Sequence, residues 1–272
     1  MGCCTGKKLS RADTTNHPIT RKPNPSAPST ADIPEISPTE LSDLRKCYEA
    51  DGQRMHHKVK DCYNAALAGK TVRTAEINMK FVNLGENGIA QLTRVLPAYG
   101  ALKSLRLWKT KLGVEGAKLV GTALPRLPLL EILSLEDNDI KAEGTAYIAK
   151  GLMYVLFIKE LYMHINSMSL PGITALSTAL SPQSHLRVLT VDENQITPVG
   201  LHILLAALSN SFQVIQTLGF GFNMLGDEGA REVLRTLKEM PELRKVTLTG
   251  NSVSAEVESE LKQGVSAVYI VM

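Results

Sequence analysis

The sequence predicts an α/β solenoid, a fold in which one strand–helix unit is repeated along the chain. First, one position of the repeat follows each expected strand, and successive copies of this position are 28, 28, 28, 28, 29 and 28 residues apart. It is an asparagine in five of the seven copies. Second, a glycine lies six residues later in six of the copies. A fixed period of this length is typical of a solenoid, whose units bury their apolar faces against their neighbours. The seven positions are Val82, Thr110, Asn138, Asn166, Asn194, Asn223 and Asn251.

Within one repeat, the apolar spacing changes from a strand pattern to a helix pattern. In the third repeat, Leu133 and Leu135 alternate, so both side chains lie on one face of a short strand. The next element is a turn at Asn138, because an asparagine amide can bond backbone groups that leave the strand ladder. Ile148 and Leu152 then follow at i, i+4 spacing, which predicts an amphipathic helix packed behind the strand.

The pattern L-x-x-L-x-L-x-x-N-x-L followed by a glycine resembles the leucine-rich repeat family. The long-repeat type occurs in ribonuclease inhibitor and in Ran GTPase-activating protein. In the third repeat the matching residues are Leu130, Leu133, Leu135, Asn138, Ile140 and Gly144. The resemblance covers residues 72 to 265 and implies a curved horseshoe, with parallel strands on the concave face, helices on the convex face and a glycine opening each helix. Since Val82 and Thr110 replace asparagine and Val257 replaces the seventh glycine, we expect an incomplete side-chain ladder at the start and a closing repeat at the end.

The segments that flank the repeats have their own patterns. The first 36 residues are rich in proline and poor in large apolar residues, which predicts disorder. Ser37, Pro38 and Glu40 then form a capping-box pattern that opens a helical cap. Tyr269–Met272 is interpreted as a last strand. The alternative is that these residues are a hydrophobic C-terminus that fits a peptide-binding groove, which captures the terminal carboxylate. The division is 1–36, a tether; 37–70, a helical N-terminal cap; 71–253, seven strand motifs; and 254–272, a C-terminal cap.

The N-terminus reads Met-Gly-Cys-Cys-Thr-Gly-Lys-Lys and resembles the start of dually acylated proteins. Gly2 presents the amine for N-myristoylation once the first methionine is removed, although Gly6 stands where serine or threonine is usual. Because one acyl chain binds a membrane only marginally, a second signal is needed. Candidate palmitoylation sites are Cys3 and Cys4, while Lys7 and Lys8 would each add about 1 kcal/mol of attraction to an anionic leaflet.

Composition and charge restrict the location and the class of partner. The net charge is +3, without the density of basic residues that a nucleic-acid-binding domain needs. The sequence has four cysteines and no apolar signal segment, no 18-residue apolar run and no N-x-[ST] sequon. We therefore expect a cytoplasmic protein at the inner face of a membrane, as in some ciliary or flagellar membrane proteins.

The strand residues that flank the buried positions are expected to face outward on the concave side. Arg106, Trp108 and Lys109 are predicted to form a basic-aromatic patch on the second repeat. Exposed tryptophan, tyrosine and arginine are enriched at binding hot spots. A predicted acidic zone follows on the third and fifth repeats, with two further residues between its acids. The acids are Glu136, Asp137, Asp192 and Glu193, and the residues between them are Tyr162 and His164.

No arrangement of residues in the sequence predicts catalysis. A Walker loop is absent, and Gly219-Phe220-Gly221 lacks the third glycine of a dinucleotide fingerprint, so these glycines are interpreted as small concave residues. The spacing of Cys47, His56, His57 and Cys62 matches no familiar zinc pattern. The sequence thus predicts a non-enzymatic adaptor without a cofactor or metal, whose protein partner it does not identify. The alternative is a regulator of the Ran GTPase-activating protein type.

Overall fold

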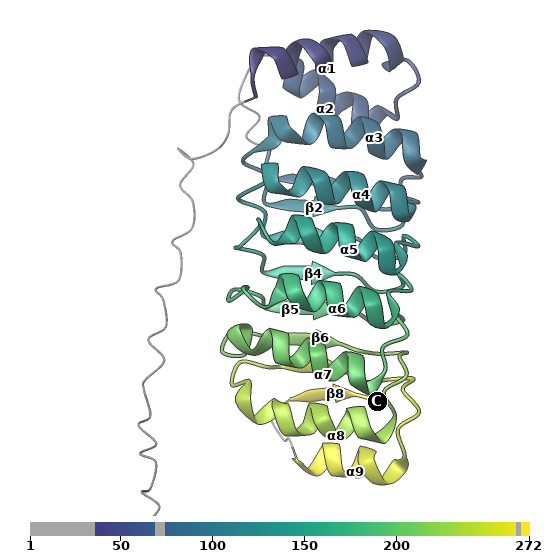
Figure 1. Cartoon of the computed structure of the whole chain (residues 1–272), viewed down its shortest axis with the longest axis vertical. Helices are drawn as coiled ribbons and strands as arrows, with labels where there is room; N and C mark the ends of the chain where they lie inside the picture. The colour runs from purple at the N-terminus through teal and green to yellow at the C-terminus, as the bar shows by residue number, and fades with distance from the viewer. Residues whose placement is uncertain (1–35, 69–73, 265–267) are drawn as a thin grey trace, which may run out of the picture.

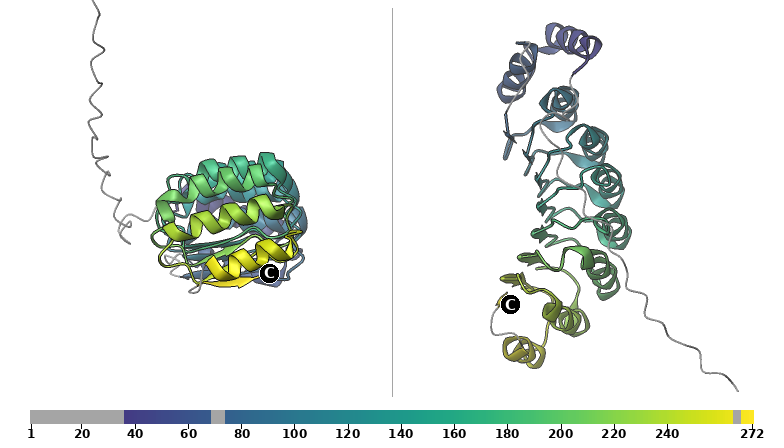
Figure 2. Two further views of the ribbon diagram at one scale, coloured as in Figure 1. Left: turned by 90° about the horizontal axis from the view of Figure 1, so that it is seen from below. Right: turned by 90° about the vertical axis from the view of Figure 1, so that its left-hand side faces the viewer.

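The computed structural model describes residues 36–68, 74–264 and 268–272, in which strands and helices are stacked in chain order (Figure 1). From the side, the stack is curved, with the strands along its inner, concave side and the helices along its outer, convex side (Figure 2). Neighbouring strands pair in parallel, and the sheet order β1-β2-β3-β4-β5-β6-β7-β8 follows the sequence. The predicted α/β solenoid with a parallel concave sheet is therefore confirmed.

The repeat unit combines a three-residue strand with a helix of 10 to 12 residues. The strands are β1 (Glu76–Asn78), β2 (Ser104–Arg106), β3 (Ile132–Ser134), β4 (Glu160–Tyr162), β5 (Val188–Thr190), β6 (Thr217–Gly219), β7 (Lys245–Thr247) and β8 (Tyr269–Val271). The α-helices are α1 (Pro38–Asp51), α2 (His57–Leu67), α3 (Gly85–Val95), α4 (Gly113–Ala123), α5 (Lys141–Leu152), α6 (Ser169–Leu180), α7 (Pro198–Ala207), α8 (Gly226–Thr236) and α9 (Ala255–Gly264). The 3₁₀ helices are η2 (Leu96–Tyr99), η3 (Leu124–Arg126), η4 (Leu208–Ser211) and η5 (Leu237–Glu239).

The core lies between the sheet and the layer of helices. The middle residue of each strand pairs with its equivalent in the next repeat, as Leu105 does with Leu133 and Leu133 with Leu161. These three leucines are fully buried, as are the helix residues Ile148 and Leu152. Each fully buried leucine or isoleucine contributes about 1.5–3 kcal/mol of transfer free energy, before the conformational entropy lost on folding is subtracted.

The repeated asparagines form a buried ladder at the exit of the strands. Asn166 Nδ2 donates to the carbonyl oxygens of Leu135 and Met163, each at 2.9 Å. Its Oδ1 accepts from the backbone N–H of Asn138 at 3.2 Å and of Ile140 at 3.4 Å. The ladder links each repeat to the next because every amide bonds backbone groups of two repeats. Its buried members are Asn138, Asn166, Asn194, Asn223 and Asn251.

The ladder changes at its N-terminal end, as the sequence predicts. Val82 is buried but has no polar side-chain group, so the side-chain ladder does not extend to the first repeat. Thr110 keeps part of it, because both its backbone N–H and its hydroxyl lie within hydrogen-bonding distance of Asn138 Oδ1, at 2.8 and 3.1 Å.

The periodic glycines lie inside the first helical turn, which corrects the expectation that they open the helix. Helix α5 begins at Lys141, three residues before Gly144. A β-carbon added at Gly144 would lie 2.6 Å from Ile140 Cγ2 and 3.0 Å from Ala117 Cβ in the preceding repeat. Glycine is therefore required here by the close approach of consecutive repeats.

Both ends of the array are closed. At the N-terminus, the predicted capping box is present, since Ser37 Oγ accepts from the Glu40 N–H and Glu40 Oε2 accepts from the Ser37 N–H. At the C-terminus, β8 pairs with β7, as predicted for the last segment, and Val257 is fully buried. Among the described helices, none has the length and apolar character needed to cross a membrane.

Candidate functional site

The geometry of the strand exits determines how residues reach the rim of the concave face. The residue before each ladder position has a left-handed backbone, as at Phe81 (φ 61°), Lys109 (φ 54°) and Asp137 (φ 52°). This region is unfavourable for residues other than glycine. Here it is maintained by backbone hydrogen bonds between repeats, such as Lys109 N–H to Glu136 O at 2.8 Å.

Three rings form a row across the first four strands, which we call the aromatic ledge: Phe81, Trp108 and His164. The centroids of Phe81 and Trp108 are 4.7 Å apart, and those of Trp108 and His164 are 6.0 Å apart in an edge-to-face arrangement. Lys80 Nζ lies 5.2 Å from the centroid of the Trp108 ring, within the range of a cation–π interaction. Phe81 is 63% exposed, so the ledge is open to solvent at its N-terminal end.

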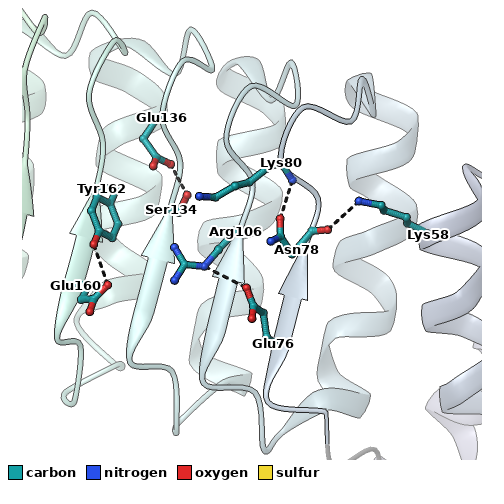
Figure 3. Close-up of polar contacts among 9 residues, drawn as sticks. All are labelled: Lys58, Glu76, Asn78, Lys80, Arg106, Ser134, Glu136, Glu160 and Tyr162. Atoms are coloured by element: carbon teal, nitrogen blue, oxygen red, sulfur yellow. Dashed lines mark hydrogen bonds and ion pairs between the residues drawn. The ribbon is translucent and has the colours of Figure 1, made fainter.

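Glu136 lies beneath the ledge, which corrects the expectation of an exposed acid at this position. Only 4% of the residue is exposed. Trp108 follows β2 and His164 follows β4, so the contact between their rings bridges the intervening repeat, which contains β3 and Glu136. The Ser134 hydroxyl donates to Glu136 Oε2, so the buried carboxylate has a polar partner (Figure 3).

Two further carboxylates of the concave face, those of Glu76 and Glu160, have partners within it. Arg106 Nε lies 3.2 Å from Glu76 Oε1, and the Tyr162 hydroxyl donates to Glu160 Oε2 at 2.8 Å (Figure 3). Burial, reinforced by this hydrogen bond, raises the pKa of Tyr162 to about 12, so the phenol stays protonated at neutral pH.

The predicted basic and acidic zones are in contact at the rim. Lys109 Nζ, from the basic-aromatic patch, lies 2.8 Å from Asp137 Oδ2, from the acidic zone. Both groups remain partly exposed, so each can exchange this partner for one on another protein at little cost. The two zones therefore do not form separate patches of opposite sign at this point.

Asp192 reaches across to the sixth repeat. Its Oδ1 accepts from the Gly221 N–H at 2.7 Å, and its Oδ2 occupies the space that a side chain at position 219 would need. Burial raises the pKa of Asp192. The two glycines of Gly219-Phe220-Gly221 therefore make room for this carboxylate, which supports their interpretation as small concave residues.

The structure brings only some of the predicted site residues together. Most lie around the ledge, and Asp192 adjoins it, because its backbone oxygen accepts from the N–H of Ile165, the residue after His164, at 3.0 Å. The exposed Glu193 follows Asp192 in the fifth repeat. Phe81 was not predicted as a site residue, although it holds the same repeat position as Lys109. Gly2, Cys3, Cys4, Lys7 and Lys8 lie outside the described residues. In the described ranges, no group of histidine, cysteine, aspartate or glutamate residues is arranged to hold a metal ion.

One family model and several solved structures are similar to this chain. A family model described as Leucine Rich repeat matches residues 126–149, and no curated protein matches the sequence. Among solved structures, the chain is similar to the tropomodulin C-terminal domain of Caenorhabditis elegans (16% identity, TM-score 0.48, covering 57% of this chain and 93% of that one). It is also similar to a Bacteroides fragilis protein (18% identity, TM-score 0.45, covering 67% of this chain and 51% of that one). A third similar structure is actin-binding site 2 of leiomodin-1 (14% identity, TM-score 0.43, covering 66% of this chain and 87% of that one). The family match and the geometry of the chain together identify the fold as a leucine-rich-repeat solenoid.

Proposed function

We propose that this leucine-rich-repeat solenoid is a non-enzymatic adaptor that binds a partner protein through the aromatic ledge. The observation that carries the proposal is the position of Trp108, the only tryptophan of the chain, on the concave face between Phe81 and His164. Aromatic residues supply much of the energy of protein interfaces because they bury a large area with little loss of side-chain freedom.

The groups around the ledge favour a partner surface that combines apolar and polar contacts. Lys80 and Arg106 lie on the same face, and Glu136 and Ser134 form a hydrogen-bonded pair below the rings. A partner that covers the ledge would bury Phe81, which is now 63% exposed, without breaking the pair beneath. We therefore place the centre of the interface on repeats one to four.

A variant of the exposed ring tests this interface. Phe81→Ala removes a ring that is mostly in solvent, so we expect the fold to persist and partner affinity to fall by about thirtyfold, equivalent to a hot spot of about 2 kcal/mol. Trp108→Ala should have at least this effect. The matched control is Tyr154→Ala, because Tyr154 is 69% exposed and follows helix α5 away from the ledge. Equal affinities for Phe81→Ala and wild type would move the interface elsewhere.

The second part of the proposal is attachment to the inner face of a membrane by acylation of Gly2 and of Cys3 or Cys4. It rests on the N-terminal sequence, where an amine, two thiols and two lysines occur together. We expect Gly2→Ala to shift the protein from the membrane fraction to the soluble fraction of cells, and proximity labelling to report a changed set of neighbours. Unchanged partitioning of Gly2→Ala would contradict this attachment.

A catalytic-regulator function is tested separately. The alternative of a Ran-type GTPase-activating protein predicts faster GTP hydrolysis by a small GTPase in the presence of this chain. An adaptor predicts no change in that rate.

A further inference from the structure

A cleft of about 540 Å³ lies between the N-terminal cap and the first repeat, and none of the ledge residues lines it. One wall comes from the connection between α1 and α2, and the other from helix α3 and the loop before it. Junctions between structural units are common places for ligand sites. The polar side chains of the cleft therefore indicate what it could bind.

Two arginines line the cleft, and neither forms an ion pair with a carboxylate of the described residues. One is Arg54, and the other, Arg94, donates from Nη1 to the Sγ of Cys47 at 3.3 Å. The pKa of Arg94 is raised by its hydrogen bond with Cys47 and, to a smaller extent, by the charge of Asp51. Three other arginines are paired with glutamates: Arg106 with Glu76, Arg126 with Glu40, and Arg231 with Glu260. Among the described residues, Arg45, Arg187, Arg235 and Arg244 form no ion pair either, but none of these four lines the cleft. Because a guanidinium carries five N–H donors, most of the donor capacity of Arg54 and Arg94 is available to a ligand.

Three amide side chains line the same cleft: Asn83, Asn87 and Gln91. None of them forms a side-chain hydrogen bond with another described residue. Asn87 and Gln91 are four residues apart in helix α3 and therefore lie on one face of it. A carboxamide offers one carbonyl acceptor and two N–H donors, so it can bond both the N–H and the C=O of an extended peptide.

We propose that the cleft binds an extended, acidic peptide segment of a partner protein. Asn87 and Gln91 would hold its backbone, and Arg54 and Arg94 would hold a side-chain carboxylate. Asp51 also lines the cleft, so the two arginines leave a formal charge of +1 with histidine neutral. This charge matches a carboxylate better than a phosphate group, which carries nearly two negative charges at neutral pH.

The test uses two capped octapeptides and the full chain. One peptide alternates glutamate with alanine, and the other has glutamine in place of each glutamate. Fluorescence anisotropy at low salt is expected to show about tenfold tighter binding of the glutamate peptide, and this advantage should shrink as salt is added. Arg54→Gln should abolish most of the advantage. The matched control is Arg235→Gln, which makes the same change at an exposed arginine of α8, outside the cleft.

The amides give an independent readout. Asn87→Ala should weaken both peptides equally, because it removes a backbone contact and leaves the arginines in place. Because Arg94 also bonds Cys47, Arg54→Gln is the decisive arginine variant. Absence of binding, equal binding of the two peptides, or an unchanged advantage in Arg54→Gln would each overturn the proposal.

Discussion

The buried asparagine ladder gives the sharpest prediction about stability, and Asn166→Ala tests it. The substitution removes both the Nδ2 donor and the Oδ1 acceptor of one ladder asparagine from the interior of the array. The carbonyl oxygens of Leu135 and Met163 each keep another donor, from Asn138 at 3.0 Å and from Asn194 at 3.0 Å. By contrast, the N–H groups of Asn138 and Ile140 donate to Asn166 Oδ1 and would lose this acceptor.

The magnitude follows from these two N–H groups. A buried polar group left without a partner costs about 1–3 kcal/mol, so two such groups predict a loss of about 2–6 kcal/mol in the free energy of unfolding. Urea unfolding followed by circular dichroism measures this loss. The control is Asn210→Ala, because Asn210 is exposed and donates one hydrogen bond, to the carbonyl oxygen of Ser181 at 2.7 Å. We expect the control to lose less than about 1 kcal/mol. Equal losses in the two variants would refute the reasoning.

Two further predictions concern the cap and the helix layer. The hydrogen bond from Arg126 lowers the pKa of Glu40 from 4.5 to about 2, so the stability that this carboxylate contributes is present above pH 4.5 and is lost as the pH falls toward 2. The stability difference between wild type and Glu40→Gln, measured by thermal unfolding across this range, should therefore shrink on acidification; a constant difference would contradict the pairing. A β-carbon at Gly151 would clash with the carbonyl oxygen of Gly121, so Gly151→Ala should destabilise the chain by about 1–3 kcal/mol despite the better helix propensity of alanine. The control is Gly200→Ala, because the atom nearest to a β-carbon at Gly200 is Ile196 Cγ2, at 3.3 Å, and we expect a smaller change in the free energy of unfolding in urea. A Gly151→Ala variant more stable than wild type would contradict this prediction.

The fold was predictable because the repeat imposes the same local choices seven times. A single Leu-x-Leu pair is compatible with several folds, but registered copies fix the strand, the turn and the helix together. The sequence also located the capping box at Ser37 and the last strand at Tyr269–Met272, since both depend on neighbouring residues. What it misplaced was the start of the helices, because the position of Gly144 reflects contact with the preceding repeat.

The candidate site was less predictable because it depends on side chains from non-adjacent repeats. The alternation of the strand places Glu136 on the concave face, but its burial follows from the contact of Trp108 with His164, which are 56 positions apart in the sequence. Phe81 and Lys109 hold the same position in neighbouring repeats, so the repeat pattern alone did not indicate that Phe81 belongs to the site. The cleft at the cap escaped prediction because two segments separated in the sequence form it.

Site-specific photo-cross-linking in cells tests the central claim most directly. A photoreactive phenylalanine analogue at position 81 lies on the ledge, and the same analogue at Thr122 lies on the exposed surface of helix α4. We predict a discrete set of cross-linked proteins from position 81 that is absent from position 122 and is lost when Trp108→Ala is added. The same products from both positions, or products that persist with Trp108→Ala, would contradict an interface on the ledge.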